Sequence, residues 1–313
     1  MPDAHAKNKE IAMPTYLSPK SDITFKKVFG NEHHKIVTIS FLNSILNLKD
    51  DKRITEISFV DTANVREAMS LKDTFIDVHC VDGIGNHFLI EMQVDSQAWF
   101  IQRALYYLSL VFARQLPYGI NYHKLVPVIC ITILNHIKFP EHNNVMSHYV
   151  FIEKNSLQLL PEQYLELYFI ELPKFTKTED QLETEIDEWL FFMTSAQDVQ
   201  AVPQKMKKSK EFQEAFHVLD KMKWTEAEFF AYLAQLDKAD KPRRIAEAAR
   251  QEGELKGKIE GKIEGRIEGE LQGELKKAEA VALHGLQKGL DLSLIQELTG
   301  LSIEQLEALR KKI

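Results

Sequence analysis

Apolar and polar residues alternate with a period of two in the first third of the chain. The runs TFIDVHCVD and HFLIEMQV flank the short segment Gly83-Ile84-Gly85. This period is typical of β-strands, and a short connection that contains glycine favours a hairpin. One face of the second run is apolar, whereas the other face carries Glu91 and Gln93. The sequence therefore predicts an antiparallel hairpin over positions 74–94 with two polar groups side by side on one face.

Helical and strand periods alternate along the remaining chain up to position 250. The predicted helices cover a segment that begins at Ser21 or Asp22, either of which can cap it, and positions 36–46, 96–116 and 180–250. The predicted strands cover 54–60, 125–134, 149–154 and 165–172, of which 125–134 is apolar throughout, as in strands buried on both faces. This order predicts an α/β fold, with a central mixed sheet in a core over 16–175. A helical region over 176–250 is expected to pack on the core or to follow it.

Glycine recurs at every fourth position within the segment 251–277. In the run GELKGKIEGKIEGRIEGELQGEL, a Leu or Ile follows each glycine by two positions. A spacing of four exceeds the helical period, so the apolar stripe winds around a helix by about 40° per step. Each glycine costs a helix about 1 kcal/mol relative to alanine. We expect a marginal helix that self-associates, with close approach at the glycines, and the alternatives are a flexible tether and a repeat expansion without a specific role.

Residues 278–313 predict a small helical module. Asp291 and Ser302 are candidate N-caps for its last two helices. The TGLS segment between these helices resembles the turn of a helix-turn-helix. Glu304 and Glu307 on the last helix would repel phosphates, so a protein–protein contact is favoured over DNA binding.

Composition narrows the class of protein. The chain has 313 residues, 44% hydrophobic and 27% charged, with a net charge of −7, which fits one large domain plus an appendage. Cys80 and Cys130 lie in apolar runs and are expected to be buried free thiols in a reducing compartment. The segment 1–15 lacks the apolar core of a signal peptide and is expected to be disordered. The most apolar helical run, 99–116, contains two arginines and is short for a membrane span, so we expect a soluble, cytoplasmic protein with no membrane partner.

The polar face of the hairpin carries the candidate chemistry. If positions 83–85 form a three-residue loop, counting back along both strands puts Asp77 opposite Glu91. Directly opposed side chains lie about 5 Å apart on one face, and two carboxylates at that distance repel one another. A divalent cation between them would remove this cost, and magnesium suits oxygen ligands and retains waters for chemistry. The hairpin therefore indicates a magnesium site at Asp77 and Glu91, with Gln93 beside it.

Two other interpretations of these carboxylates are open. They could face solvent on an exposed sheet face, although His79 and Leu89 share that face and make it unevenly polar. Paired carboxylates at this spacing also serve retaining glycoside hydrolysis, which needs a sugar cleft that is usually rich in tryptophan, and the chain has three. The helix that follows adds Arg103 and Tyr107 on one side, and an arginine suits bidentate contact with phosphate.

These motifs together resemble a known family. Asp77, the short hairpin and Glu91-Met92-Gln93 resemble the metal-binding core of the PD-(D/E)XK nucleases, with Gln in place of Lys. The segment DITFKKVFG, the order of IEMQ and RALYY, the tail with glycine at every fourth position and the terminal TGLS are similar to the recombination-promoting nuclease/transposase family. The resemblance covers residues 16–313. It implies a restriction-endonuclease-like fold, magnesium dependence and DNA cleavage linked to recombination or transposition.

Carried over residue by residue, the resemblance implies the site of a metal-dependent DNA endonuclease. Asp77 and Glu91 would be metal ligands, and Asp22 would be a further ligand unless it serves only to cap its helix. Gln93 stands at the lysine position of the motif, where its amide cannot act as a cation or an efficient base but can orient a water. Candidate contacts to DNA phosphates are Lys20, Lys26, Lys27, Arg103 and Tyr107.

Two expectations concern the protein as a whole. A homo-oligomer is expected to form through the C-terminal region. The alternative to an endonuclease is a catalytically weak or inactive protein on the same fold that binds DNA or another protein, because the net charge is acidic and Gln93 departs from the motif.

Overall fold

The computed structural model describes residues 15–61, 76–94, 99–116 and 121–311. The chain forms two compact units, one that ends at Asp237 and one that begins at Lys238, and helix α7 (Glu226–Gln287) contributes to both. Of the expected disordered N-terminus, only residue 15 is described, and positions 74–75 of the predicted hairpin and 96–98 of the predicted helix also lie outside the described residues.

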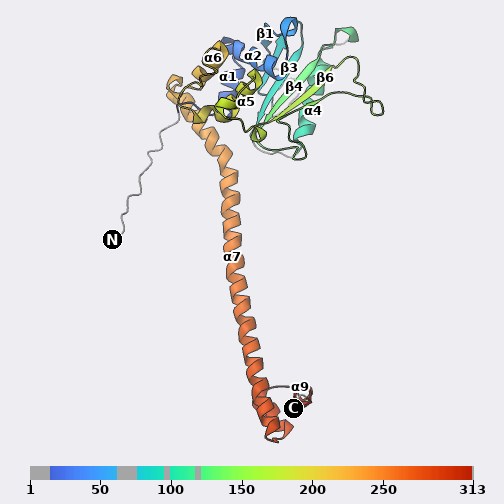
Figure 1. The fold of residues 1–313 in the computed structure, drawn as a ribbon, viewed down its shortest axis with the longest axis vertical. Helices are drawn as coiled ribbons and strands as arrows, with labels where there is room; N and C mark the ends of the chain where they lie inside the picture. The colour runs from blue at the N-terminus through green and yellow to red at the C-terminus, as the bar shows by residue number, and fades with distance from the viewer. Residues whose placement is uncertain (1–14, 62–75, 95–98, 117–120, 312–313) are drawn as a thin grey trace, which may run out of the picture. The chain divides into compact units, whose positions relative to one another are not determined.

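A mixed sheet forms the centre of the first unit (Figure 1). Within the described residues its strand order is β1-β2-β3-β4-β6-β5. The strands are β1 (Ile57–Phe59), β2 (Val78–Asp82), β3 (His87–Gln93), β4 (Val128–Leu134), β5 (Met146–Tyr149) and β6 (Leu165–Glu171). The three central strands β3, β4 and β6 run parallel, and the others join antiparallel. Every residue of β4 is buried, which confirms the prediction from its unbroken apolar run.

Helices cover both faces of this sheet. Four helices pack against the face that carries Phe88, Ile90 and Met92, and α4 packs against the face that carries Leu89 (Figure 1). The four helices are α1 (Asp22–Phe29), α2 (Lys35–Ile45), α5 (Glu185–Ser195) and α6 (Lys210–Leu219), and the fifth is α4 (Phe100–Arg114). The predicted α/β fold with a central mixed sheet is therefore confirmed, and α5 and α6 pack on the core.

The hairpin has the predicted register. Val78 pairs with Ile90 and His79 with Leu89, and the loop closes where the Asp82 N–H donates to the Asn86 carbonyl over 3.1 Å. Gly85 has a φ of +100°, which a residue with a Cβ rarely adopts. This register fixes which residues of β3 face α4 and which face α1.

Two predicted strands differ from the structure in extent. The strand predicted over 54–60 is confirmed but covers only β1. The strand predicted over 149–154 lies earlier in the chain, as β5, because the chain turns after it. The Glu153 carboxylate accepts hydrogen bonds from the N–H groups of Asn155 and Ser156, and Leu157 is left-handed with a φ of 56°. The apolar residues around this turn pair only briefly, through an isolated antiparallel bridge between Ile152 and Leu159.

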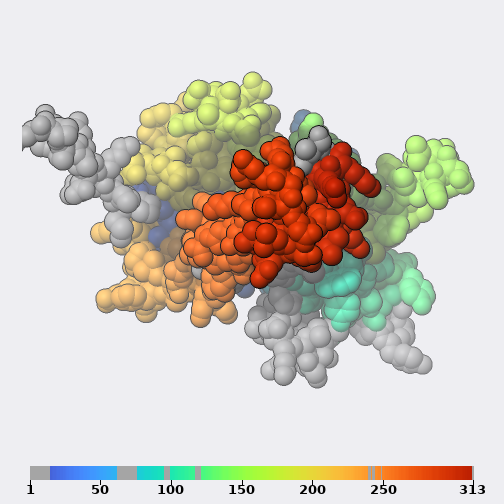
Figure 2. Space-filling view, turned by 90° about the horizontal axis from the view of Figure 1, so that it is seen from below, coloured from blue at the N-terminus to red at the C-terminus, as the bar shows by residue number. Residues whose placement is uncertain are grey.

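The second unit is a small helical cluster at the end of α7. Helices α8 (Leu292–Thr299) and α9 (Ile303–Arg310) pack against it around Ile295 and Leu306. Figure 2 shows the red C-terminal residues gathered beside the orange residues of α7. The predicted caps are confirmed, since the Asp291 side chain accepts from the Ser293 N–H and that of Ser302 from the Gln305 N–H.

Both cysteines are buried and free, as expected. Among the described residues, no helix is long and apolar enough to cross a membrane.

The segment with glycine at every fourth position is helical and lies within α7. A Cβ built on Gly257, Gly261 or Gly265 would meet no atom within 4 Å. By contrast, a Cβ on Gly285 would lie 3.1 Å from the Ile295 side chain, inside the small cluster. The repeat glycines therefore weaken the helix without relieving any contact within the chain.

Replacement of Gly257, Gly261 and Gly265 by alanine should strengthen this part of α7, by about 1 kcal/mol for each substitution. Hydrogen exchange of the amides in 253–275 should slow accordingly. Gly285→Ala is the matched control and should bring no gain, because its methyl group meets Ile295. Unchanged exchange in the triple variant would show that the segment is not helical in solution.

Candidate active site at the carboxyl end of β3

Glu91 and Gln93 lie at the carboxyl end of β3 on the face covered by α4. Both are buried, with 5% and 6% of their surface exposed. One guanidinium nitrogen of Arg103, Nη2, donates to Glu91 Oε1 over 2.8 Å and to Gln93 Oε1 over 2.6 Å. The arginine comes from the first half of α4, which places it over the end of the strand. The two polar groups of the predicted motif are therefore held together by one cation.

Asp77 lies just before β2, where strand alternation breaks. Ile76 packs in the cluster under α4, whereas Val78 packs in the cluster on the opposite face. The ladder with β3 ends at Val78, and the Asp77 carboxylate then accepts a hydrogen bond from the Met92 N–H over 2.8 Å. This carboxylate supplies the partner that a strand residue would otherwise give to that buried N–H. The predicted face-to-face pair is thus corrected, because Asp77 binds the backbone next to Glu91 from outside the ladder.

Helix α1 brings a second cation to this end of the sheet. Lys26 Nζ lies 2.6 Å from Asp22 Oδ1 and 3.3 Å from Asp77 Oδ1. Ser21, not Asp22, caps α1, because its side chain accepts from the Thr24 N–H. Asp22 is therefore available to join Lys26 and Asp77 in a small charged cluster. The cations at the site come from helices on opposite faces of the sheet, Lys26 from α1 and Arg103 from α4.

A comparison with known families gives one match. Residues 19–248 match the family described as PD-(D/E)XK nuclease family transposase. The chain belongs to this family. No curated protein and no solved structure gave a match. The resemblance inferred from the motifs is confirmed, and the mixed sheet flanked by helices is consistent with a PD-(D/E)XK-like core.

The two carboxyl groups of this nuclease-family site are hard to ionise. Burial raises the pKa of Glu91 to about 7, although the charge of Arg103 and its hydrogen bond lower it. Burial also raises the pKa of Asp77 to about 7. The hydrogen bond from the Met92 N–H and the charge of Lys26 lower this pKa, whereas Asp22 raises it further. Burial lowers the pKa of Lys26, but Asp22 and Asp77 raise it overall. Desolvation is therefore the main cost of charge at this site, and a nearby cation is what offsets it.

The donor set of these carboxyl groups fits magnesium. Within the described ranges, no three His, Cys, Asp or Glu side chains form a complete metal cluster. Magnesium is usually bound by one or two carboxylates, with water and substrate phosphate as its remaining ligands. Asp77 and Glu91 are hard oxygen donors whose burial demands a positive charge, and Gln93 adds an amide oxygen beside them. A two-carboxylate site completed by water and phosphate is consistent with these residues.

The structure places the other predicted phosphate contacts unequally. Lys27 Nζ lies 2.6 Å from Glu228 Oε1 and 4.2 Å from the centre of the Trp224 ring, so this lysine is engaged with the base of α7. Tyr107 is buried and packs in the cluster under α4, so its contact with phosphate stays a prediction. Lys20 is half-buried. Burial lowers its pKa, although the charge of Asp198 acts in the opposite direction. Of the five predicted phosphate contacts, Lys26 and Arg103 are the ones that pair with Asp77 and Glu91.

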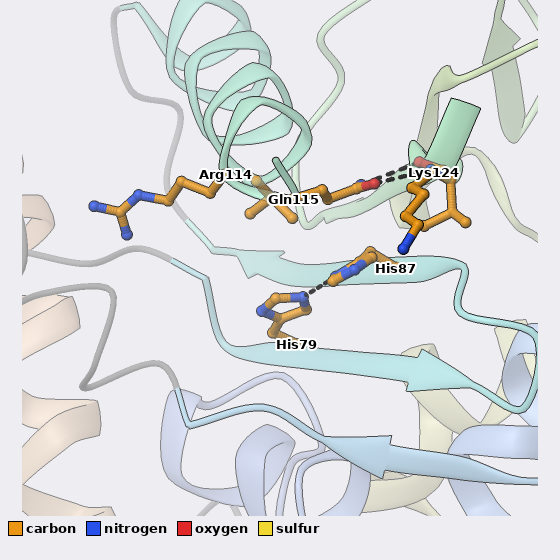
Figure 3. A pocket seen from close by; sticks show the side chains of 7 residues that line it. His79, His87, Arg114, Gln115 and Lys124 are labelled. Atoms are coloured by element: carbon orange, nitrogen blue, oxygen red, sulfur yellow. Dashed lines mark hydrogen bonds between the residues drawn. The ribbon is translucent and has the colours of Figure 1, made fainter. Parts of the chain in front are cut away.

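A separate cavity, which the sequence patterns above do not predict, lies at the other end of β3. It has a volume of about 350 Å³ and is lined by His79, His87, Arg114 and Lys124, among others. His79 Nε2 and His87 Nδ1 are 2.9 Å apart, Lys124 points toward His87, and Arg114 points away from the pair (Figure 3). The register could have indicated the contact, because His87 is the diagonal neighbour of His79 across the hairpin. Since His87 and Gln93 stand at opposite ends of β3, this cavity does not belong to the carboxyl site.

Asp77→Asn should change how the stability of the metal-free protein depends on pH. In the unfolded chain this carboxyl group ionises near 3.8, whereas in the folded protein it does so near 7. Between these values the unfolded state releases its proton first, so the folded state loses stability as pH rises. In urea unfolding with a chelator, the loss from pH 5 to pH 8 should be smaller in Asp77→Asn by roughly 2 kcal/mol.

Asp187→Asn provides the matched control for this measurement. Although burial raises its pKa, the bonds from Lys177 and neighbouring groups lower it below the ordinary value. Asp187 is therefore ionised in both states above pH 5, and its replacement should lower stability equally at pH 5 and pH 8. An Asp77→Asn profile parallel to that of the unsubstituted protein would contradict the raised pKa.

Proposed function

We propose that this family member is a magnesium-dependent DNA endonuclease that hydrolyses phosphodiester bonds in recombination or transposition. The observation that carries the proposal is the pair of largely buried carboxyl groups at the end of β3, each paired with a cation from a different helix. The family match supports nuclease chemistry on this fold. Two acidic and two basic side chains gather at this end of the sheet. Such a group suits a reaction in which a charged phosphate is bound and attacked.

Asp77 and Glu91 are the proposed ligands of the metal, with Asp22 as a further group that Lys26 links to Asp77. Bound there, magnesium would polarise the phosphate and lower the pKa of a coordinated water. The protein holds the two carboxyl groups in fixed positions, since the Met92 N–H orients Asp77 and Arg103 orients Glu91. Such positioning limits the reorganisation needed during the reaction.

Lys26 and Arg103 have a second proposed role once a metal neutralises the carboxylates. Their charges are then no longer needed by Asp77 and Glu91 and become available to the DNA phosphate. The guanidinium fork of Arg103 suits bidentate contact, and Lys26 provides a point charge on the other side. Lys20 is retained as a more distant phosphate contact. Gln93 would orient the attacking water through its amide, because it cannot supply the positive charge of the motif lysine.

One observation favours the alternative, a protein on this fold that binds DNA without cutting it. Arg103 donates to both Glu91 and Gln93, so these side chains already satisfy one another without metal. With Gln in place of Lys, the site also lacks one transition-state cation. The alternative and the endonuclease are separated by the activity of matched variants.

Nicking of supercoiled plasmid DNA should require magnesium and should fall at least about a hundredfold in Asp77→Asn and in Glu91→Gln, since the loss of a metal-holding carboxylate costs several kcal/mol of transition-state stabilisation. Glu166→Gln is the control carboxylate, because it lies on β6 near the opposite end of the sheet and bonds His148. This control should cut at the normal rate.

Unchanged nicking in both site variants would refute the assignment of Asp77 and Glu91. If the unsubstituted protein binds DNA but leaves it intact in magnesium, the non-cleaving alternative is correct. Binding should then weaken in Lys26→Ala but not in Lys27→Ala, because Lys27 is held by Glu228.

A further inference from the structure

The repeat segment of α7 exposes a continuous row of large apolar side chains. This apolar row consists of Leu255, Ile259, Ile263, Ile267, Leu271 and Leu275, each between 46% and 63% exposed. The buried cluster formed with α8 and α9 includes Ala278 and Ala282, and at its edge Leu271 and Leu275 line a cavity with Leu301. Contiguous apolar surface of this kind on a polar helix marks an interaction site more often than a solvated face.

Two columns of charged residues flank the apolar row, one on each side. The first column follows each glycine and consists of Glu254, Lys258, Lys262, Arg266, Glu270 and Glu274. The second column precedes the next glycine and consists of Lys256, Glu260, Glu264, Glu268, Gln272 and Lys276. Each column lies about 100° from the apolar row, because neighbouring residues of a helix are separated by that angle. The glycines occupy the side of the helix opposite the apolar row.

The two columns change sign together along the helix. Where the first column is acidic, at Glu254 and Glu274, the second is basic, at Lys256 and Lys276. In the middle, the first column is basic over three repeats and the second is acidic. Only Gln272 interrupts this relation, since it is uncharged. Opposite charges therefore occupy the two flanks of the apolar row in five of the six repeats.

A single helix does not use this complementarity. Residues two apart, such as Lys262 and Glu264, do not face one another on a helix, whereas residues four apart do. The neighbours at that spacing are Lys258, Lys262 and Arg266 on one flank, which repel one another. On the other flank Glu260, Glu264 and Glu268 are equally unfavourable. Among the described residues, the ion pairs of this stretch are Arg250–Glu254, Lys256–Glu252 and Arg266–Glu270. The first two lie outside the central repulsive runs, and the third lies at the end of one.

We propose that the apolar row binds the same row of a second copy of this chain, with the two helices parallel and in register. In a parallel pair the first flank of one helix faces the second flank of its partner, as with the e and g positions of a coiled coil. Lys258, Lys262 and Arg266 then meet glutamates of the partner. The like-charged ends, Glu254 and Glu274, meet the partner's lysines of the second column.

An antiparallel pair is disfavoured by the same charges. Each flank would then face its own counterpart, so that the basic run around Lys262 meets itself and the acidic run around Glu264 does likewise.

The spacing of four also sets the packing geometry. Rows of residues at i and i+4 interdigitate at a crossing angle of about −50°, and a period above 3.6 coils the helices right-handedly. The glycines lie away from this contact, so the pairing depends on the apolar row and its flanks.

Charge reversal of each flank tests this pairing in the full-length protein. The variant Lys258→Glu/Lys262→Glu/Arg266→Glu has two acidic flanks, and Glu260→Lys/Glu264→Lys/Glu268→Lys has two basic flanks. Sedimentation equilibrium should show a dimer dissociation constant at least about tenfold weaker for either variant, because several favourable pairs become repulsive together. An equimolar mixture of the two should form heterodimers of normal affinity.

The chain that carries both sets of reversals is the matched control, because its composition and net charge equal those of the unsubstituted protein apart from the exchange of arginine for lysine. It should dimerise normally. The proposal is overturned if the unsubstituted protein is monomeric, or if the single-flank variants sediment as it does. It is equally overturned if the combined reversal fails to restore the dimer while circular dichroism shows unchanged helix content.

Disulfide trapping tests the orientation. In a parallel, in-register pair Ile259→Cys lies opposite itself and should cross-link under mild oxidation. In an antiparallel pair centred on Ile263 it would lie opposite position 267, so only a mixture of Ile259→Cys and Ile267→Cys chains would link across the two variants. The unsubstituted chain, whose Cys80 and Cys130 are buried, is the control and should not cross-link. Linking found only between the two different variants would overturn the parallel arrangement.

Discussion

A carboxylate buried in a protein needs a proton or a cation beside it, and this requirement organises the carboxyl end of β3. Glu91 ends up there because β3 is a central strand with packed layers on both faces. Arg103 reaches it from one layer, and Lys26 reaches Asp77 from the other. The last turn of α1 and the first turn of α4 must therefore both reach this end of the sheet. Burial makes ionisation of these carboxyl groups unfavourable when no metal is bound. For the same reason, a divalent cation beside them would be stabilising.

The fold itself explains why the two carboxyl groups differ in their surroundings. Glu91 belongs to a strand and is fixed by the strand register, so its orientation follows from alternation. Asp77 lies just beyond the end of the ladder between β2 and β3. Its carboxylate is fixed by the Met92 N–H, which has no backbone partner on β2. Strand pairing thus fixes Glu91, whereas a side-chain hydrogen bond beyond the end of the β2–β3 ladder fixes Asp77. A change of loop length or of strand length at this point would move Asp77 without moving Glu91.

Much of this arrangement is visible in the sequence, because it rests on local periodicity. The glycine turn and the alternation of β2 and β3 determine the register, and the unbroken apolar run of β4 indicates a strand buried on both faces. The break in alternation at Asp77 could not be predicted, since it depends on where the ladder stops and on which helix supplies a cation. For the same reason, the spacing of Tyr107 from Arg103 defines a side of the helix but does not indicate that Tyr107 is buried. The partnership of Lys27 with Glu228 joins segments about two hundred residues apart, and no local pattern signals it.

The central claim is that Asp77 and Glu91 together hold a divalent cation, and melting of the protein with and without magnesium tests it most directly. A ligand that binds the folded state alone raises its stability by mass action. At pH 8, a saturating concentration of magnesium should raise the melting temperature of the unsubstituted protein above its value in a chelator. The same addition should leave Asp77→Asn/Glu91→Gln unchanged and should raise Glu166→Gln as much as the unsubstituted protein. An equal rise in the double variant, or no rise in the unsubstituted protein, would contradict the claim.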